Sequence, residues 1–333
     1  MNTSSVPFDE SGEFVLAFKH SDEKGILEFF DKYGFVVISD ALTEEEADKT
    51  LSELFDCCER NKKFNRWKIS TWNNWPSNSI EVYGNISRPP LFSKQILMNR
   101  QNPRIYKVFS LLLGTDQILH NHDRAGLMRP TKNVDMGRGV TKDMPHWKTK
   151  TNLHLDMNPT NYLGDPALTR SKLAKLDYSL TNQFIIENNL PHESFCGGRS
   201  LQGVLNLNDN RQQDGGFICV PGFHKEFKDY FTSKQEVEPA AVSVNFFPKQ
   251  NIYKRFVRIP VRKGSMIVWD QRTPHGSQCN ASSNFRAAMF VKMFPKCQLP
   301  EKTRNLRRMA VKKMINKCQG FEITEVGRMV FDL

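Results

Sequence analysis

The chain has 333 residues, of which 39% are hydrophobic and 25% charged, and its formal net charge is +11. This balance is typical of a globular protein and excludes a disordered one. No apolar run is long enough to span a membrane, no secretion signal is visible at the start, and seven scattered cysteines argue against a disulfide scaffold. We therefore expect an intracellular, cytoplasmic protein with reduced thiols.

Two helices and a strand are predicted in the first sixty residues. An amphipathic segment at 25–33 ends at Gly34 and precedes the β-branched run 35–38. Thr43 with Glu46 three residues later has the pattern of a capping box, which predicts the start of a second helix. The stretch 61–90 is rich in Asn, Ser, Trp and Pro and is predicted to be mostly loop. A helix near 105–113 and a strand near 117–121 follow.

Short strands separated by turns dominate the region from 127 to 293. They are predicted at 201–207, 217–220, 256–260, 265–269 and 286–291, which indicates a sandwich or barrel. A long charged insertion at 158–199 interrupts this region, and we interpret it as a mobile lid over the substrate.

A basic helix is predicted at the C-terminal end. Lys and Arg are frequent in 300–321, where Leu306, Met309, Ala310 and Met314 recur at near-helical spacing. We expect this apolar stripe to pack against the protein and the charged face to be solvated. The alternative is an anion-binding helix.

The motif His154-Leu155-Asp156 carries the clearest chemistry. An imidazole and a carboxylate two residues apart on a strand point to the same face. Together with a distant third ligand, His275, they match the 2-His-1-carboxylate triad that holds non-haem Fe(II). His154 and Asp156 alone could be a structural pair, but Arg286, eleven residues after His275, favours the metal interpretation because a guanidinium can bind a cosubstrate carboxylate.

The remaining histidines have weaker patterns. His120 and His122 show the same alternate spacing, but they precede the predicted core, so strand or pocket roles are favoured over ligation. His224 is interpreted as a structural histidine at a turn. For His146 and the adjacent Trp147, lining the pocket mouth and simple packing both remain open.

The chain resembles the phytanoyl-CoA dioxygenase-like group of Fe(II)/2-oxoglutarate oxygenases from about 25 to 293. Besides the triad, the resemblance rests on the segments 29–38 and 42–46 and on the turn and strand at 207–210 and 215–225. It implies one domain over 1–333 that is mainly β with flanking helices. Its core would be a double-stranded β-helix, a cupin-like jelly-roll at 127–293 supported by helices and strands at 24–126 and followed by the basic helix within 294–333.

The resemblance also implies roles for individual residues. His154, Asp156 and His275 would hold Fe(II), and Arg286 would bind the far carboxylate of 2-oxoglutarate. Arg129 would approach this cosubstrate, and Gln202 would make a polar contact to it. Oxygen would be the second cosubstrate, and ascorbate an auxiliary reductant.

The implied reaction is hydroxylation or desaturation of a C–H bond, with release of succinate and carbon dioxide. Asp156 disfavours halogenation, because related halogenases carry a small residue at that position. The expected substrate is a small molecule, for which an anion or a coenzyme A thioester would suit the basic chain. The alternatives are a jelly-roll binding protein that has lost turnover and an oxygenase acting on a macromolecule. Nucleic acid is disfavoured, since Lys292 stands where nucleic-acid demethylases of this superfamily carry a second Arg.

Overall fold

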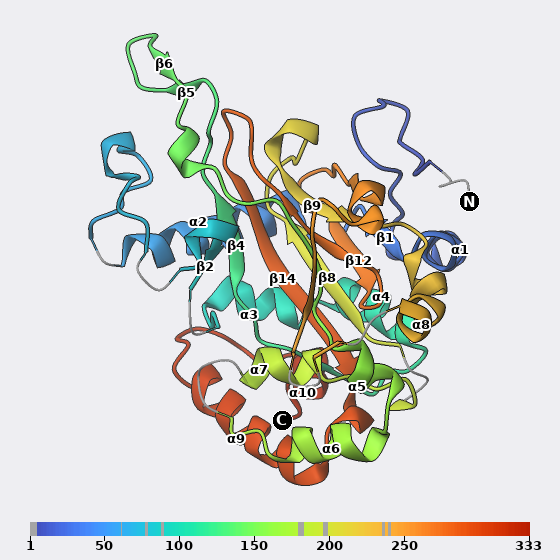
Figure 1. Cartoon of the computed structure of the whole chain (residues 1–333). Coiled ribbons are helices and arrows are strands. Elements are labelled where there is room, and N and C mark those ends of the chain that lie inside the picture. Colours follow the sequence, from blue (N-terminus) through green and yellow to red (C-terminus); the bar gives the residue numbers. More distant parts are fainter. Residues whose placement is uncertain are drawn as a thin grey trace.

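Two antiparallel sheets form the centre of the computed structural model, which describes residues 5–60, 62–76, 79–87, 90–178, 183–195, 199–234, 237–238 and 241–333 (Figure 1). Within these residues the larger sheet has seven strands in the order β1-β12-β8-β14-β4-β2, and β3 also pairs with β14. Its strands are β1 (Phe35–Ile38), β2 (Asn85–Ile86), β3 (Ile118–His120), β4 (Ala125–Met128), β8 (Leu201–Asn206), β12 (Met266–Asp270) and β14 (Arg286–Pro295).

The smaller sheet has five strands in the described part of the chain, in the order β10-β7-β13-β9-β11. Leu153 and Leu155 point to its outer face and pack in an apolar cluster with Phe223 and Phe227, so the alternate residues face the larger sheet. The strands are β7 (Asn152–Leu155), β9 (Gly216–Cys219), β10 (Val244–Phe246), β11 (Val257–Arg258) and β13 (His275–Gln278). A separate hairpin of β5 (Val134–Asp135) and β6 (Thr141–Lys142) projects at the top of Figure 1.

Helices from the N-terminal part support the larger sheet. Helix α1 (Glu23–Tyr33) ends at Gly34, whose positive φ of 75° suits a residue without a Cβ. Helix α2 (Glu44–Glu59) begins at the predicted capping box of Thr43 and Glu46. Helices α3 (Lys94–Arg100) and α4 (Pro103–Leu113) follow, and α4 contacts β14. These elements share one large apolar cluster with the sheet, from Val15 to Phe331.

The described helices of the insertion lie beside the C-terminal helices in the lower part of Figure 1. They are α5 (Pro159–Leu163), α6 (Pro166–Ala174) and α7 (Gln183–Ile186), whereas α8 (Phe223–Lys234) packs on the smaller sheet. Helix α6 contacts α9 (Glu301–Ile315), where the Thr303 hydroxyl donates to the Leu173 carbonyl over 3.3 Å. Helix α10 (Glu325–Phe331) follows. No helix in the described ranges is long and apolar enough to cross a membrane.

The expected apolar stripe of the C-terminal helix is not the face that the helix buries most deeply. Helix α9 buries the row Thr303, Arg307, Val311 and Ile315, whereas Met309 is 70% exposed. The physical reason is Arg307, which is fully buried and donates to the carbonyl oxygens of buried backbone, including that of Phe331 over 3.3 Å. These hydrogen bonds turn the Arg307 row inward, so that Leu306 and Met309 face solvent while Ala310 still packs at the edge of the core.

Candidate active site

The three residues of the predicted triad converge on the inner side of the smaller sheet. His154 lies on β7, Asp156 follows directly after that strand, and His275 begins β13. The two strands are neighbours, and His275 is the cross-strand partner of His154. One ligand atom from each of the three side chains lies within 4.8 Å of the others. Among the described residues this is the one group of His, Cys, Asp and Glu side chains that could enclose a metal ion.

Neighbouring groups orient these side chains. The Nδ1 of His275 lies 3.0 Å from the Thr273 carbonyl, and the Nε2 atoms of His154 and His275 lie 3.3 and 3.6 Å from the Asp156 carboxylate. Burial lowers the pKa of His275, which favours the neutral ring that a metal requires. Burial opposes ionisation of Asp156, but the charges of Lys292 and His154 hold its pKa well below the usual value. Two imidazoles and an ionised carboxylate therefore fit Fe(II).

Arg286 reaches the same space from the first position of β14 in the opposite sheet. Its side chain is buried, and its Nε has no hydrogen-bond partner among the described residues. Gly126 and Gly216 make room for it, because a Cβ at either position would lie 2.9 or 3.0 Å from a guanidinium nitrogen. Burial lowers its pKa to about 10, so it stays charged at neutral pH. A buried cation without a protein acceptor fits the carboxylate of a cosubstrate.

Arg129 and Gln202 do not occupy the positions expected of cosubstrate contacts. Met128 is the cross-strand partner of Arg286, so the next residue, Arg129, faces the other side of the sheet. There its guanidinium lies over the Trp75 ring, 4.6 Å from the ring centroid, and neither it nor Gln202 lines the cavity around the triad.

Gln202 contacts the carboxylate of Asp156 instead. Its Nε2 donates to Asp156 Oδ2 over 2.9 Å, and its Oε1 accepts from Trp269 Nε1 over 3.0 Å. The side chain is fully buried, so both hydrogen bonds are shielded from water. Gln202 thus supports the triad from behind.

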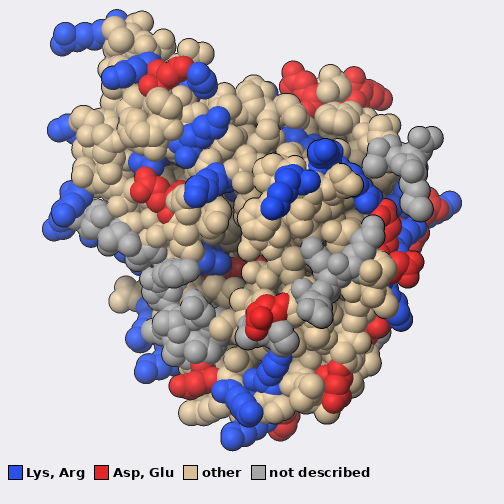
Figure 2. Space-filling model, viewed as in Figure 1, with Lys and Arg blue, Asp and Glu red and all other residues tan. Residues whose placement is uncertain are grey.

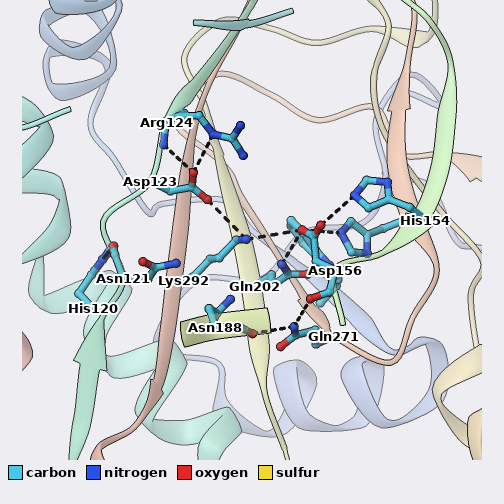
Figure 3. A network of polar contacts seen from close by, with 12 residues as sticks. His120, Asn121, Asp123, Arg124, His154, Asp156, Asn188, Gln202, Gln271 and Lys292 are labelled. Carbon is cyan, nitrogen blue, oxygen red and sulfur yellow. Dashed lines mark hydrogen bonds and ion pairs between the residues drawn. The ribbon is translucent and has the colours of Figure 1, made fainter. Parts of the chain in front are cut away.

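Sequence reasoning missed Lys292 as a member of the site. Its Nζ lies 3.4 Å from Asp123 Oδ2 and 3.5 Å from Asp156 Oδ2 (Figure 3). The signal was present in the sequence, because Lys292 is an even number of residues after Arg286 on one strand and therefore shares its face. A lysine on the inward face of a central strand needs a partner, and the structure supplies two carboxylates.

A cavity of about 350 Å³ opens beside the triad. Phe217 and Trp269 form part of its apolar wall, and Arg124 lies at its polar side. No described residue of the insertion 158–199 lines it, so the lid interpretation gains no support from the described residues. The insertion supports the site indirectly, because Gln271 Nε2 donates both to the Asn188 carbonyl and to the backbone carbonyl of Asp156, each over 2.7 Å.

The other histidines lie outside the triad. His120 and His122 are fully buried, and burial lowers the pKa of both well below the usual value. His224 lies in the first turn of α8 and contacts the Asp31 carbonyl over 3.0 Å, which fits a structural role. His146 is exposed and lies 3.2 Å from the Asn73 side chain, away from the residues that line the cavity.

The chain is similar in sequence to a known protein family. A family model described as phytanoyl-CoA dioxygenase (PhyH) matches residues 187–288. A Dictyostelium discoideum protein named "Putative phytanoyl-CoA dioxygenase" is 42% identical over 313 residues, which cover 92% of this chain and 86% of that protein.

Solved structures agree on the fold. The epimerase SnoN, crystallised with Fe3+, alpha ketoglutarate and nogalamycin RO, has a TM-score of 0.52 and 15% identity over 82% of this chain and 84% of its own. The Escherichia coli protein JW0805 has a TM-score of 0.62 and 12% identity over 95% of this chain and 84% of its own. The jelly-roll expectation is thereby confirmed. The chain belongs to the phytanoyl-CoA dioxygenase family, and the expected class of iron- and 2-oxoglutarate-dependent oxygenase is confirmed at the level of that family.

Proposed function

We propose that this chain hydroxylates or desaturates a C–H bond of a small anionic molecule, using Fe(II) and 2-oxoglutarate. The observation that carries the proposal is the convergence of His154, Asp156 and His275 on a cavity that Arg286 enters from the opposite sheet. The first three residues would hold the metal on one face and leave the face toward the cavity open. Arg286 would fix the far carboxylate of 2-oxoglutarate.

Each part of the chain has a defined task in this proposal. When bound, the iron supplies oxygen activation, driven by the oxidative decarboxylation of 2-oxoglutarate to succinate. Asp156 fills the carboxylate position of the triad, which favours hydroxylation or desaturation over halogenation. Phe217 and Trp269 exclude water from one wall of the cavity, where their ring centroids lie 4.5 Å apart.

The charges in the cavity support an anionic substrate. Lys292 lies between two carboxylates, and Arg286 is assigned to the cosubstrate. Arg124 also lines the cavity, and Asp123 Oδ1 accepts from its Nε over 3.2 Å. The terminal nitrogens of Arg124 have no hydrogen-bond partner in the part of the chain that the structure describes, and its guanidinium could bind a carboxylate or a phosphate with both. A volume of about 350 Å³ accommodates a small substrate, or the reactive end of a longer one, beside 2-oxoglutarate.

On the face seen in Figure 2, the distribution of surface charge favours a small molecule over nucleic acid. Figure 2 shows Lys and Arg in small groups separated by Asp, Glu and uncharged residues on this face. A protein that follows a phosphate backbone usually presents a continuous basic surface. Two basic side chains of α9 are also held within the protein, since Arg304 and Arg308 both pair with Asp332.

The test is a screen for succinate release with the full-length protein, Fe(II) and 2-oxoglutarate. The candidate substrates are carboxylates, phosphate esters and coenzyme A thioesters, each paired with a neutral ester or amide analogue. We expect an anionic compound to stimulate succinate release, and Arg124→Met to raise its KM about 30-fold or more without changing the requirement for 2-oxoglutarate. Arg262→Met, an exposed arginine paired with Asp9, is the matched control. Equal stimulation by the neutral analogues would contradict the anionic substrate.

A further inference from the structure

A buried ion pair lies directly behind the metal-binding carboxylate. The Lys292 ammonium bridges Asp123 Oδ2 and Asp156 Oδ2, at 3.4 and 3.5 Å, and the side chains of Lys292 and Asp123 are only 6% and 3% exposed (Figure 3). Lys292 is the cross-strand partner of Gln202, so both side chains point from the larger sheet toward Asp156.

Asp123 is itself fixed, which makes the bridge rigid. Its Oδ1 accepts from the backbone nitrogen of Arg124 over 2.7 Å and from the Arg124 side chain over 3.2 Å. The backbone of Lys292 is held as well, because its carbonyl accepts from the Asn121 nitrogen over 2.8 Å. The ammonium therefore has one defined position between the two carboxylates.

The two oxygens of Asp156 consequently differ in their surroundings. Oδ2 accepts from Gln202 over 2.9 Å and faces the Lys292 charge. Oδ1 has neither contact. Each oxygen lies near one imidazole of the triad, Oδ1 at 3.3 Å from His154 Nε2 and Oδ2 at 3.6 Å from His275 Nε2. Oδ2 is thus occupied by one hydrogen bond and one ion pair, whereas Oδ1 is free of both and is the oxygen better placed to bind a metal.

We propose that Lys292, held by Asp123, is a positioning residue that restricts Asp156 to binding the metal through one oxygen and reduces its donation of electron density. The proposal rests on the assignment of His154, Asp156 and His275 as ligands. Contacts in the shell behind metal ligands generally control both the geometry and the electronic properties of a metal. A full positive charge behind the carboxylate is a stronger influence than a neutral amide.

The simpler interpretation is a buried ion pair with a structural role only. Stability measurements cannot distinguish the two, because replacing a buried pair by apolar side chains is often neutral or stabilising. Metal affinity is also ambiguous. Removing the lysine charge strengthens the attraction between Asp156 and a cation, whereas losing a contact to the carboxylate weakens its orientation.

In the visible spectrum of the anaerobic complex with Fe(II) and 2-oxoglutarate, the proposal predicts that an absorption band moves in one direction only. An iron(II) ion chelated by an α-keto acid absorbs by charge transfer from the metal to the keto group. A more strongly donating Asp156 raises the energy of the donor electrons, so the band moves to longer wavelength.

The proteins to compare are wild type, Lys292→Met, Lys292→Arg and the double variant Asp123→Asn with Lys292→Met. Lys263→Met is the matched control, because Lys263 pairs with Asp48 over 2.7 Å and does not line the cavity.

We expect the band to move to longer wavelength in Lys292→Met and in the double variant, and to stay in place in Lys263→Met. Lys292→Arg keeps the charge and should bring the band back toward the wild-type position. An unshifted band in the double variant overturns the proposal even if Lys292→Met alone is shifted, because the shift would then come from the stranded Asp123 carboxylate. If the wild-type protein itself gives no band, the proposed function fails, and that result appears before any substitution is made.

Discussion

His154 and His275 are cross-strand partners on β7 and β13, and their imidazole centroids lie 4.7 Å apart. Residues far apart in the sequence are thus brought together by the register of one sheet. Strands hold side chains more precisely than loops, so the two imidazoles are preorganised by backbone hydrogen bonds. Asp156, the third residue of the predicted triad, lies beyond the end of its strand.

His275→Ala should abolish metal binding without unfolding the protein. The substitution removes one of three ligand atoms, and the backbone pairing of β13 with β7 does not require the ring. Even the loss of an outer contact typically weakens metal binding about 10- to 100-fold, so the loss of a ligand should exceed the upper value. Titration of the metal-free protein with Co(II) measures this effect. His146→Ala, an exposed histidine outside the cavity, should bind as the wild type does, and tight binding by His275→Ala would contradict the ligand assignment.

Arg286→Ala should raise the requirement for 2-oxoglutarate while iron affinity changes little. Losing a charge-assisted contact in a buried site costs about 2–5 kcal/mol, or roughly 30- to several thousand-fold in affinity. Equilibrium binding of 2-oxoglutarate to the Fe(II) protein under anaerobic conditions measures the loss. An unchanged dissociation constant would show that another residue binds the far carboxylate.

Gly126→Ala tests the same site without touching the charge. A Cβ at position 126 would lie 2.9 Å from Arg286 Nη1, so the guanidinium must move. We expect weaker 2-oxoglutarate binding than in the wild type, though less weak than in Arg286→Ala, and unchanged binding of Co(II). Wild-type affinity for 2-oxoglutarate would mean that the precise position of the guanidinium is unimportant.

The convergence of His154 and Asp156 could be predicted because the two residues form a local pattern that keeps its meaning in the folded chain. His154 lies on β7 and Asp156 follows directly after that strand, and the capping box at Thr43 is a contact within four residues. Arg129 shows the limit of such patterns. Its role depended on the face to which β4 turns it, and that face is set by the pairing of Met128 with Arg286, which no local pattern shows.

Contacts between distant elements account for the other differences between the structure and the expectations from the sequence. The orientation of α9 depends on Arg307, whose Nε lies 3.5 Å from Glu187 Oε1 in the insertion, so apolar periodicity alone did not identify the most deeply buried face. The role of Gln202 was likewise hidden, because its partner Asp156 belongs to the opposite sheet. A strand pattern identifies the inward side chains but not the groups that they meet across the core.

Gln202→Leu should weaken binding of the metal rather than binding of the cosubstrate. The substitution removes the donor to Asp156 Oδ2 and also leaves Trp269 Nε1 without its acceptor. We expect the Fe(II) dissociation constant to rise about 10- to 100-fold, in line with the loss of outer contacts at other metal sites. Binding of 2-oxoglutarate at saturating iron should stay near the wild-type value. The opposite pattern, intact iron binding with weak 2-oxoglutarate binding, would restore the original expectation of a cosubstrate contact.

Glu187 should make the stability of the protein depend on pH. Its carboxyl group is fully buried, accepts a hydrogen bond from the Tyr178 hydroxyl and lies beside Arg307. Burial raises its pKa to about 7 in spite of the arginine, whereas the unfolded chain has the ordinary value of 4.5. Between these two pH values the folded protein binds more protons than the unfolded chain, so the free energy of unfolding falls as pH rises through this window. The size of the effect is about 1.4 kcal/mol for each unit of displacement.

Glu187→Gln removes this titration and keeps a side chain of the same shape. We therefore expect the Tm of the variant, relative to wild type, to increase as the pH is raised from 5 to 8. Thermal unfolding of both proteins across this range measures the difference, with Glu325→Gln at the start of α10 as an exposed control. Above about pH 8 Glu187 is ionised in both states, so the Tm difference between the variant and wild type should stop changing with pH and stay at its largest value. Parallel Tm curves for Glu187→Gln and wild type would show that Arg307 keeps Glu187 ionised throughout, and that the insertion is joined to α9 by a permanent ion pair.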